Sequence, residues 1–309
     1  MSIRVAMVGH GGVGAIHAAR LRGEPDVELV TVFGVEREPA KQFASANAIP
    51  HVSETLAEAV SLAEAAIICS PSPVHFEQAR ECLSGGVHTL VEMPPCETTQ
   101  EAEELAELAR TQEVRLSCAH TSRYLVPYSR IEASLRANEL GAIQEVHYVR
   151  HHRLRERAWT DDALLHHAAH PIDLLIHWFG GLVPLACVAV PQVRNAQTVA
   201  LLGKLPNGAP ATVSVTYASR LPHVRMHIVG DRHTLETDGF SYIRSDLDSL
   251  QFNGEEQALY EKAVHDQDLD FLRSCRGERG GVAWQEAMRL IKTVNRFQEL
   301  GNRGGTGGQ

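Results

Sequence analysis

The chain has 309 residues, a length that suits two domains better than a single compact one. Hydrophobic residues make up 44% of it and charged residues 22%, so the composition is that of an ordinary globular protein and excludes a disordered or fibrous chain. Its apolar runs are far shorter than the roughly 20 residues of a membrane-spanning helix. The net charge of −9 argues against nucleic acid as a partner.

The cysteines and the first residues bear on the cellular compartment. Six cysteines are scattered without a C-x-x-C pair, and several stand in apolar contexts where free thiols act as small hydrophobic groups. The chain runs from its first residues into a strand-like segment, so we expect no secretory signal. These features predict a cytoplasmic protein that does not bind membranes.

Between residues 3 and 116 short β-branched runs alternate with helical stretches, which is typical of a parallel sheet covered by helices. Thr98 is an expected N-cap, with Glu101 in the first turn that follows. We therefore predict an α/β Rossmann domain with a doubly wound parallel sheet over residues 1–121. Its strands are expected at 3–8, 28–33, 65–69, 87–91 and 114–117, and its helices at 13–22, 39–46, 55–60, 74–84 and 99–111.

After residue 126 the pattern changes to that of an α+β domain, predicted over residues 122–281. Asn207-Gly208 indicates a tight hairpin in an antiparallel sheet. The C-terminal helix, about 282–300, is able to pack back on the first domain, and the Gly-rich residues 301–309 are expected to form a flexible tail. Helices are expected at 127–138, near 171–179, and at 255–275, and strands at 145–151, 198–205, 211–217, 224–229, 233–237 and 241–245.

A glycine-rich turn follows the first strand and opens the first helix, the context in which a G-x-G-x-x-G match predicts dinucleotide binding. Gly9 allows the tight turn, Gly11 lets backbone amides approach a pyrophosphate, and Gly14 permits close packing of helix and strand. Gly12 and Val13 complete the loop at the helix N-terminus, where free N–H groups favour phosphate. The alternative is a glycine-rich turn in an unrelated α/β protein.

The second strand is followed by Glu36 and Arg37, about 20 residues beyond the glycines. A carboxylate at this point accepts hydrogen bonds from the adenosine ribose and repels a 2′-phosphate, whereas an arginine attracts that phosphate. We expect NAD(P) as the cofactor, with a preference for NAD through Glu36.

Three further segments resemble the Gfo/Idh/MocA oxidoreductases: residues 69–75 (CSPSPVH), 85–94 (GGVHTLVEMP) and 166–173 (HHAAHPID). The resemblance spans nearly the whole chain. It implies a Rossmann domain followed by an open-faced, mainly antiparallel sheet that supports a homodimer or homotetramer. It also implies that an alcohol is oxidised, or a carbonyl reduced, next to a nicotinamide.

The resemblance also assigns residues. On the cofactor side it implies Ser70, Pro71, His75, Glu92, Met93 and Pro94, with a cis peptide bond before the last of these. Met93 stands where the family usually has a catalytic lysine, and His166 stands where it usually has an aspartate four residues before the catalytic histidine. Both departures argue against ordinary sugar dehydrogenation.

Residues 159–161 and 119–123 are similar to one branch of the family, which acts on carboxylated semialdehydes from aromatic ring cleavage and also lacks the lysine. This similarity implies a small, anionic substrate. Arginines of the basic loop 150–157 and Arg123 suit such a substrate, because guanidinium groups pair with carboxylates through two hydrogen bonds. The alternative is a solvated basic loop or a dimer contact. The expected substrate-binding residues are Arg123, Arg153, Trp159 and His167.

Hydride transfer from an alcohol needs a group that takes the hydroxyl proton, and histidine suits neutral pH. We expect His170 to be this base, with His166 and Asp173 as further catalytic residues, Asp173 orienting an imidazole if the stretch is helical. Pro171 places the helix start near His170. The alternative is a set of polar histidines at a domain junction.

Three other functions stay open at this point. A sugar or cyclitol dehydrogenase could replace the lysine's role with histidine. A dinucleotide-binding sensor without redox activity could have lost the lysine. A zinc hydrolase could use His166, His170 and Asp173 as ligands, but no second metal-binding motif accompanies them, and we assign no metal.

Overall fold

The structure is a computed structural model that describes residues 2–153 and 161–304. The chain forms two compact units. The first unit comprises Met1–Thr121 and Glu261–Met288, and the second comprises Ser122–Tyr260 and Arg289–Gln309. Residues 261–281, which the sequence pattern placed in the second domain, therefore group with the first unit.

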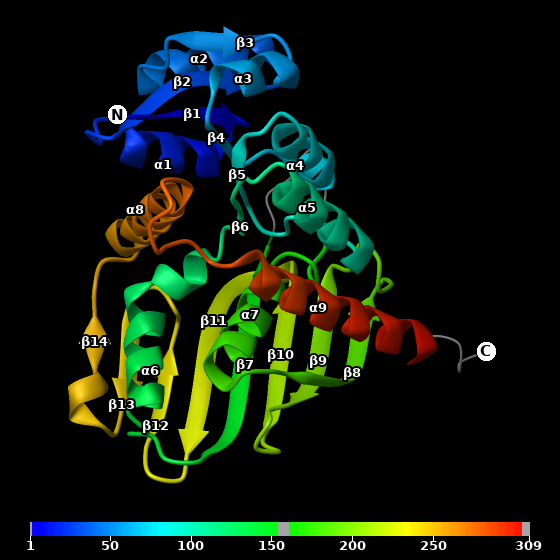
Figure 1. The fold of residues 1–309 in the computed structure, drawn as a ribbon. Helices are drawn as coiled ribbons and strands as arrows, with labels where there is room; N and C mark the ends of the chain where they lie inside the picture. The colour runs from blue at the N-terminus through cyan, green and yellow to red at the C-terminus, as the bar shows by residue number, and fades with distance from the viewer. Residues whose placement is uncertain (1, 154–160, 305–309) are drawn as a thin grey trace. The chain divides into compact units, whose positions relative to one another are not determined.

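A six-stranded parallel sheet forms the centre of the first unit, with the strand order β3-β2-β1-β4-β5-β6 (Figure 1). This is the expected doubly wound sheet, in which the order of the strands reverses between β1 and β4. The strands are β1 (Ile3–Val8), β2 (Val27–Phe33), β3 (His51–Ser53), β4 (Ala65–Ile68), β5 (His88–Val91) and β6 (Leu116–Cys118). The helices are α1 (Gly12–Leu21), α2 (Arg37–Asn47), α3 (Leu56–Leu62), α4 (His75–Ser84), α5 (Thr99–Thr111) and α8 (Glu256–Cys275), with a short 3-10 turn at Ser72–Val74.

Local sequence explains where these elements begin. Thr98 accepts a hydrogen bond from the backbone N–H of Glu101, and the Glu101 carboxylate accepts one from the backbone of Thr98, so a capping box opens α5 as predicted. The strand β3 was not predicted, because three residues are too few to show a periodic pattern.

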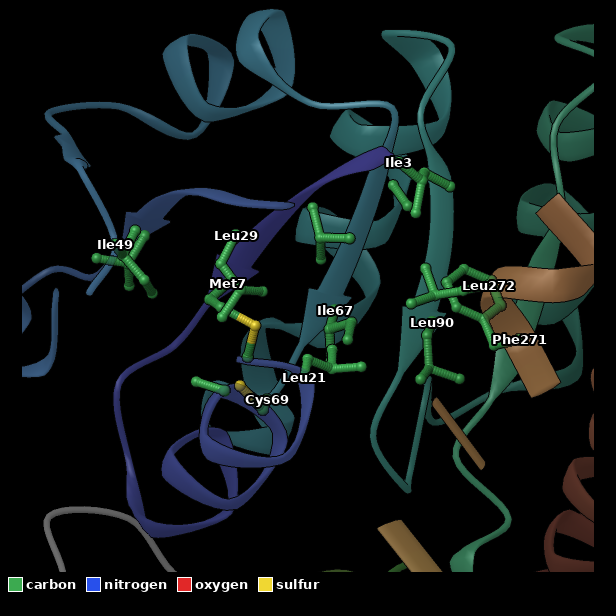
Figure 2. Packing of buried hydrophobic residues seen from close by; sticks show 14 of the residues in the cluster. Ile3, Met7, Leu21, Leu29, Ile49, Ile67, Cys69, Leu90, Phe271 and Leu272 are labelled. Carbon is green, nitrogen blue, oxygen red and sulfur yellow. The ribbon is translucent and has the colours of Figure 1, made fainter. Parts of the chain in front are cut away.

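The core of the first unit lies between the sheet and its helices (Figure 2). Met7 and Ile67 come from neighbouring central strands, and Leu21 comes from α1. Phe271 and Leu272 of α8 join the same cluster. Burial of large apolar side chains contributes about 1.5–3 kcal/mol each, so α8 belongs to the folding core of this unit despite its distance along the chain.

An eight-stranded sheet forms the second unit, with the order β14-β13-β12-β11-β7-β10-β9-β8. All its pairs are antiparallel except β7 with β10, which is parallel. The strands are β7 (Ile143–Arg153), β8 (Val183–Val190), β9 (Thr198–Lys204), β10 (Pro210–Thr216), β11 (Ala218–Gly230), β12 (Thr234–Thr237), β13 (Tyr242–Ser245) and β14 (Phe252–Asn253). The helices are α6 (Val126–Arg136), α7 (Ala169–Phe179) and α9 (Trp284–Gly304), which begins in the first unit, with 3-10 turns at Thr121–Tyr124 and Asp248–Leu250.

Two expectations for this unit are corrected. Residues 150–153 of the predicted basic loop continue strand β7, because β11 and β10 pair with this part of it. Residues 301–304 of the predicted tail belong to α9, where Gly301 lies close to Val193 and Cys187. The rest of that loop, 154–157, lies outside the described residues, as do residues 158–160 and 305–309.

The predicted hairpin joins β9 to β10, but its turn differs in detail. Gly208 has a φ of +94°, whereas Asn207 contributes its side chain, which accepts a hydrogen bond from Ala209 N–H and donates one to Ile143. Asn207 thus stabilises the turn through its amide rather than through a left-handed backbone. No helix within the described residues is long and apolar enough to span a bilayer.

Candidate functional site

The glycine turn at the carboxyl end of β1 has the geometry that a dinucleotide needs. Gly9 has a φ of +109°, and a Cβ there would lie 2.6 Å from Ser70 N, so only glycine fits. A Cβ on Gly14 would lie 2.8 Å from the Cys69 sulfur, which is the close packing of helix and strand expected for the third glycine. Beside Gly11 and Gly12 there is open space instead.

This open space lies at the N-terminus of α1. The N-cap residue is Gly11, so no capping side chain bonds to the first amides of the helix. The first amides of a helix have no partner within it, and together with the helix dipole they favour an anion. Gly12 and Val13 supply amides of this first turn. The residues present therefore fit the pyrophosphate of a dinucleotide.

The end of β2 carries the two residues expected to select between NAD and NADP. The Glu36 carboxylate is largely exposed and lies 3.8 Å from His10 Nε2. Arg37 instead pairs with Glu54 at 2.6 Å. This pair engages the guanidinium that was expected to compete for a 2′-phosphate.

Loops after β4 and β5 hold the other expected cofactor residues of the first unit. Ser70 Oγ bonds to Gln78, and Pro71 caps the 3-10 turn that leads into α4. The buried His75 ring links the two loops, because its nitrogens lie 2.7 Å from the carbonyl oxygen of Ser70 and 2.8 Å from that of Pro94.

The peptide bond between Met93 and Pro94 is cis, as the resemblance implied. Met93 is buried and cannot transfer a proton. Glu92 is the ionisable residue of this turn, and its backbone N–H donates to the carbonyl of Ile68 at the end of β4. Proton transfer must therefore be assigned to a residue other than the one at position 93.

The second unit gathers a cluster of histidines, and the structure brings the predicted ones together. His166 and His167 lie in the turn before α7, and His170 lies in its first turn. The ring centroid of His166 lies 4.3 Å from that of His167 and 6.0 Å from that of His170. His152 of β7 and Tyr217 complete the cluster, at 4.7 and 5.2 Å from His167.

Asp162 holds this turn in place. Its carboxylate accepts hydrogen bonds from the backbone N–H groups of Leu164, Leu165 and Ala196. Burial raises the pKa of Asp162, and these backbone donors act against that shift. The neighbouring Asp161 is buried and lies 3.4 Å from His166 Nδ1, a distance that allows an ion pair when that ring is protonated.

Burial and neighbouring cations keep two rings of the cluster neutral. Desolvation lowers the pKa of His167 well below its usual value, and the charge of Arg150 and the three other histidines lower it further. Desolvation, Arg150 and His166 also lower the pKa of His152. A neutral His167 can bind substrate through hydrogen bonds but is a poor proton acceptor at neutral pH.

The structure places Asp173 and Arg123 differently from their expected roles. Both oxygens of Asp173 accept hydrogen bonds from Arg123, at 2.8 and 2.6 Å, and the side chains are only 2% and 7% exposed. The spacing on the helix predicts that Asp173 orients an imidazole, and the structure shows in addition that its carboxylate is bound by the two-pronged guanidinium of Arg123.

Arg150 is a cation that lies close to the histidine cluster, where its charge lowers the pKa of His167. Successive side chains of a strand point to opposite faces, so Arg150 and His152 share the face of the buried Tyr148, while Arg153 shares the other face with His151. Arg153 is exposed. Trp159 lies outside the described residues.

Sequence reasoning missed Asp161, His152, Arg150 and Tyr217 as individual site residues. Tyr217 comes from the junction of β10 and β11, and no spacing rule connects it to residues 166–170. The alternation along β7 was the available signal for Arg150 and His152. Within the described residues no three His, Cys, Asp or Glu side chains converge in a way that could hold a metal ion.

Comparison with known proteins agrees with this geometry. The model of the oxidoreductase family with an NAD-binding Rossmann fold, Gfo/Idh/MocA, matches residues 3–120, and the model of the Gfo/Idh/MocA C-terminal domain matches residues 128–236. The chain is 31% identical over 230 residues to 4-carboxy-2-hydroxymuconate-6-semialdehyde dehydrogenase from Sphingobium sp. strain SYK-6, covering 70% of this chain and 72% of that protein.

A second relative and a solved structure extend the comparison. UDP-N-acetylglucosamine 3-dehydrogenase from Acidithiobacillus ferrooxidans is 28% identical over 233 residues, covering 73% of this chain and 71% of that protein. The crystal structure of GenD2 from gentamicin A biosynthesis in complex with NAD superposes with a TM-score of 0.85 at 17% identity, covering 98% of this chain and 95% of that one. Sequence and fold together show that the chain belongs to the Gfo/Idh/MocA family of NAD(P)-dependent oxidoreductases.

Proposed function

We propose that this dehydrogenase oxidises a small hydroxyl or hemiacetal compound that carries a carboxylate, with His170 as the general base. The observation that carries the proposal is the histidine cluster beside Arg150. Arg150 contacts the Phe240 ring and hydrogen-bonds to Tyr148, and neither contact neutralises its charge. Within the described residues no carboxylate pairs with it, so this charge can attract an anionic substrate. The semialdehyde dehydrogenase among the relatives acts, by its name, on a carboxylated compound, and this supports the same substrate class.

The residues divide the proposed chemistry among them. When bound, the nicotinamide supplies the hydride acceptor. The substrate hydroxyl proton passes to the imidazole of His170, and the C–O bond becomes a carbonyl as the C–H bond breaks and the hydride goes to the nicotinamide. His167, held neutral, binds the substrate by hydrogen bonding, and Asp161 orients His166 beside the base.

The cofactor preference follows from the end of β2. We propose that the protein binds NAD more tightly than NADP, because the Glu36 carboxylate is exposed and Arg37 is paired with Glu54. A carboxylate at this position repels the 2′-phosphate of NADP.

The first experiment titrates the purified protein with NAD and NADP, and then assays carboxylated semialdehydes, sugars and cyclitols with the preferred cofactor. We expect reduction of the cofactor by a carboxylated semialdehyde. Arg150→Gln is expected to lower kcat/KM for that substrate by about 10- to 150-fold, the worth of a charge-assisted hydrogen bond.

Arg153→Gln separates the two arginines, because it removes the same charge from the other face of the same strand. A loss in kcat/KM as large as that of Arg150→Gln would assign the substrate carboxylate to Arg153 instead. Faster turnover of sugars or cyclitols than of any carboxylated compound would contradict the proposed substrate. Tight cofactor binding without turnover of any compound would favour a dinucleotide-binding sensor.

A further inference from the structure

His17 of α1 is fully buried between two carboxylates of the first unit. Its Nδ1 lies 2.7 Å from Asp268 Oδ2 on α8, and its Nε2 lies 3.0 Å from Glu92 Oε1 after β5. Asp268 is also fully buried, whereas the Glu92 side chain remains 18% exposed. The proposed chemistry uses neither His17 nor Asp268. Burying charged groups costs free energy even when they are paired, so this arrangement calls for a functional explanation.

Both ring nitrogens of His17 face carboxylate oxygens, which only accept hydrogen bonds, so both must donate and the ring carries a positive charge. Burial alone lowers the pKa of His17, but the charge and hydrogen bond of Asp268, followed by those of Glu92, outweigh burial and raise the pKa to about 10. The ring is therefore an imidazolium at neutral pH, and it binds Glu92 as a cation.

Glu92 occupies the half of the sheet that faces the nicotinamide nucleotide. In a doubly wound sheet a dinucleotide lies across the carboxyl ends of the strands, one nucleotide to each half. The glycine turn and Glu36 belong to the half formed by β1 to β3, so the nicotinamide nucleotide falls to the half formed by β4 to β6. Glu92 stands at the carboxyl end of β5.

We propose that His17 and Asp268 are positioning residues, which hold the Glu92 carboxylate toward the nicotinamide nucleotide of the cofactor. This inference rests on the cofactor site of the first unit. A free glutamate side chain loses rotamer freedom when it binds a ligand, and a partner that fixes it beforehand removes this cost. His17 fixes one Glu92 oxygen, Asp268 fixes the ring, and Met93 N–H lies 3.4 Å from the other oxygen.

A double-mutant cycle on cofactor binding tests this role. NAD dissociation constants are measured for the wild type, His17→Gln, Glu92→Gln and the double variant. We expect each single change to weaken NAD about tenfold, and the double variant to bind no more weakly than Glu92→Gln alone, since His17 acts only through Glu92. Losses that add in the double variant would overturn the proposal.

ADP binding distinguishes a positioning role from a merely structural one. It contains the adenosine half of the dinucleotide and lacks the nicotinamide nucleotide, so its affinity should be the same in all four proteins. If His17→Gln weakened ADP as strongly as NAD, the residue would support the domain as a whole and the positioning role would be wrong.

Because His17→Gln leaves the Asp268 charge buried, His17→Gln/Asp268→Asn is measured as well, with amides that can bond to each other in place of the ion pair. It should show the same tenfold loss of NAD affinity. Binding as tight as in the wild type would refute the proposal.

His265→Gln is the control on α8, the helix of Asp268, because His265 Nε2 lies 2.9 Å from Glu24 in a partly exposed histidine–carboxylate pair of the same unit. NAD affinity should not change in this variant, and a loss equal to that of His17→Gln would count against the positioning role. A wild type that binds neither NAD nor NADP would instead refute the cofactor site itself.

Discussion

At the scale of single residues, the second unit shows why a list of motif residues does not assign their roles. Arg123 and Asp173 both matched expected site positions, yet they bind each other in a buried ion pair. Removing one partner of such a pair typically costs about 3–5 kcal/mol, because the other charge stays buried. Asp161, which directly follows the undescribed residues 154–160, is instead the carboxylate beside His166.

The assignment of the base to His170 gives a direct prediction. His170→Asn is expected to lower kcat by about 10²- to 10⁴-fold at neutral pH, the usual worth of a general base, with NAD affinity unchanged. Stopped-flow or steady-state reduction of the cofactor measures it. His177→Asn is the control, since His177 lies on the same helix and pairs with Glu132 at 2.9 Å.

The outcome for His166→Asn decides between the two histidines. If His166→Asn lost more activity than His170→Asn, the base would be His166, which has Asp161 as its partner. Turnover by His170→Asn close to that of the wild type would exclude His170 from proton transfer.

At the scale of elements, β8 and β9 present an apolar face that the described residues leave exposed. Val183, Val188 and Val190 of β8 and Leu202 of β9 are all exposed, and cross-strand pairing puts Val188 and Leu202 on one face. β8 is also the edge of the sheet. Contiguous exposed apolar groups beside a sheet edge mark a contact surface, which is why we expect self-association through this sheet.

Charge placed on that face should therefore change the assembly. Val188 is 65% exposed, so Val188→Asp should leave the fold intact and shift a dimer or tetramer toward smaller species, because association would bury the new carboxylate. Sedimentation velocity measures the change. Leu221→Asp, on β11 and also strongly exposed, is the control. A wild type that sediments as a monomer at every concentration would show that this face does not mediate assembly.

At the scale of the whole molecule, the buried histidines of the two units respond to pH in opposite directions. The folded pKa of His17, about 10, lies above the unfolded value near 6.5, so its stabilisation is complete below pH 6.5 and is lost as the pH rises toward 10. The pKa values of His167 and His152 are lowered, so the unfolded chain binds more protons below pH 6.5 and stability falls there.

We therefore expect maximal stability near neutral pH, with the first unit losing stability at alkaline pH and the second at acidic pH. Urea unfolding at pH 5, 7 and 9.5, combined with hydrogen exchange that separates the units, measures both effects. His17→Gln should flatten the alkaline loss in the first unit. Unchanged pH dependence in that variant would mean that other groups cause the loss.

Much of the fold could be predicted because its signals are local. Except for the three-residue strand β3, the order of strands and helices between residues 3 and 118 follows from apolar periodicity, and the start of α5 follows from Thr98 and Glu101. The pairing of distant segments has no such signal. The parallel pair β7–β10 and the presence of Phe271 in the core of the first unit depend on packing across long stretches of chain.

For the candidate site, the sequence by itself determined the glycine turn, the acidic residue after β2 and the histidine cluster before α7, because each is a short run of chain whose chemistry depends on near neighbours. Only the tertiary structure decided that Arg123 pairs with Asp173, that Arg150 and Tyr217 join the histidines, and that Asp268 and Glu92 enclose His17. These contacts join residues 17 to 251 positions apart, and which charges meet is settled by the packing of elements rather than by local spacing.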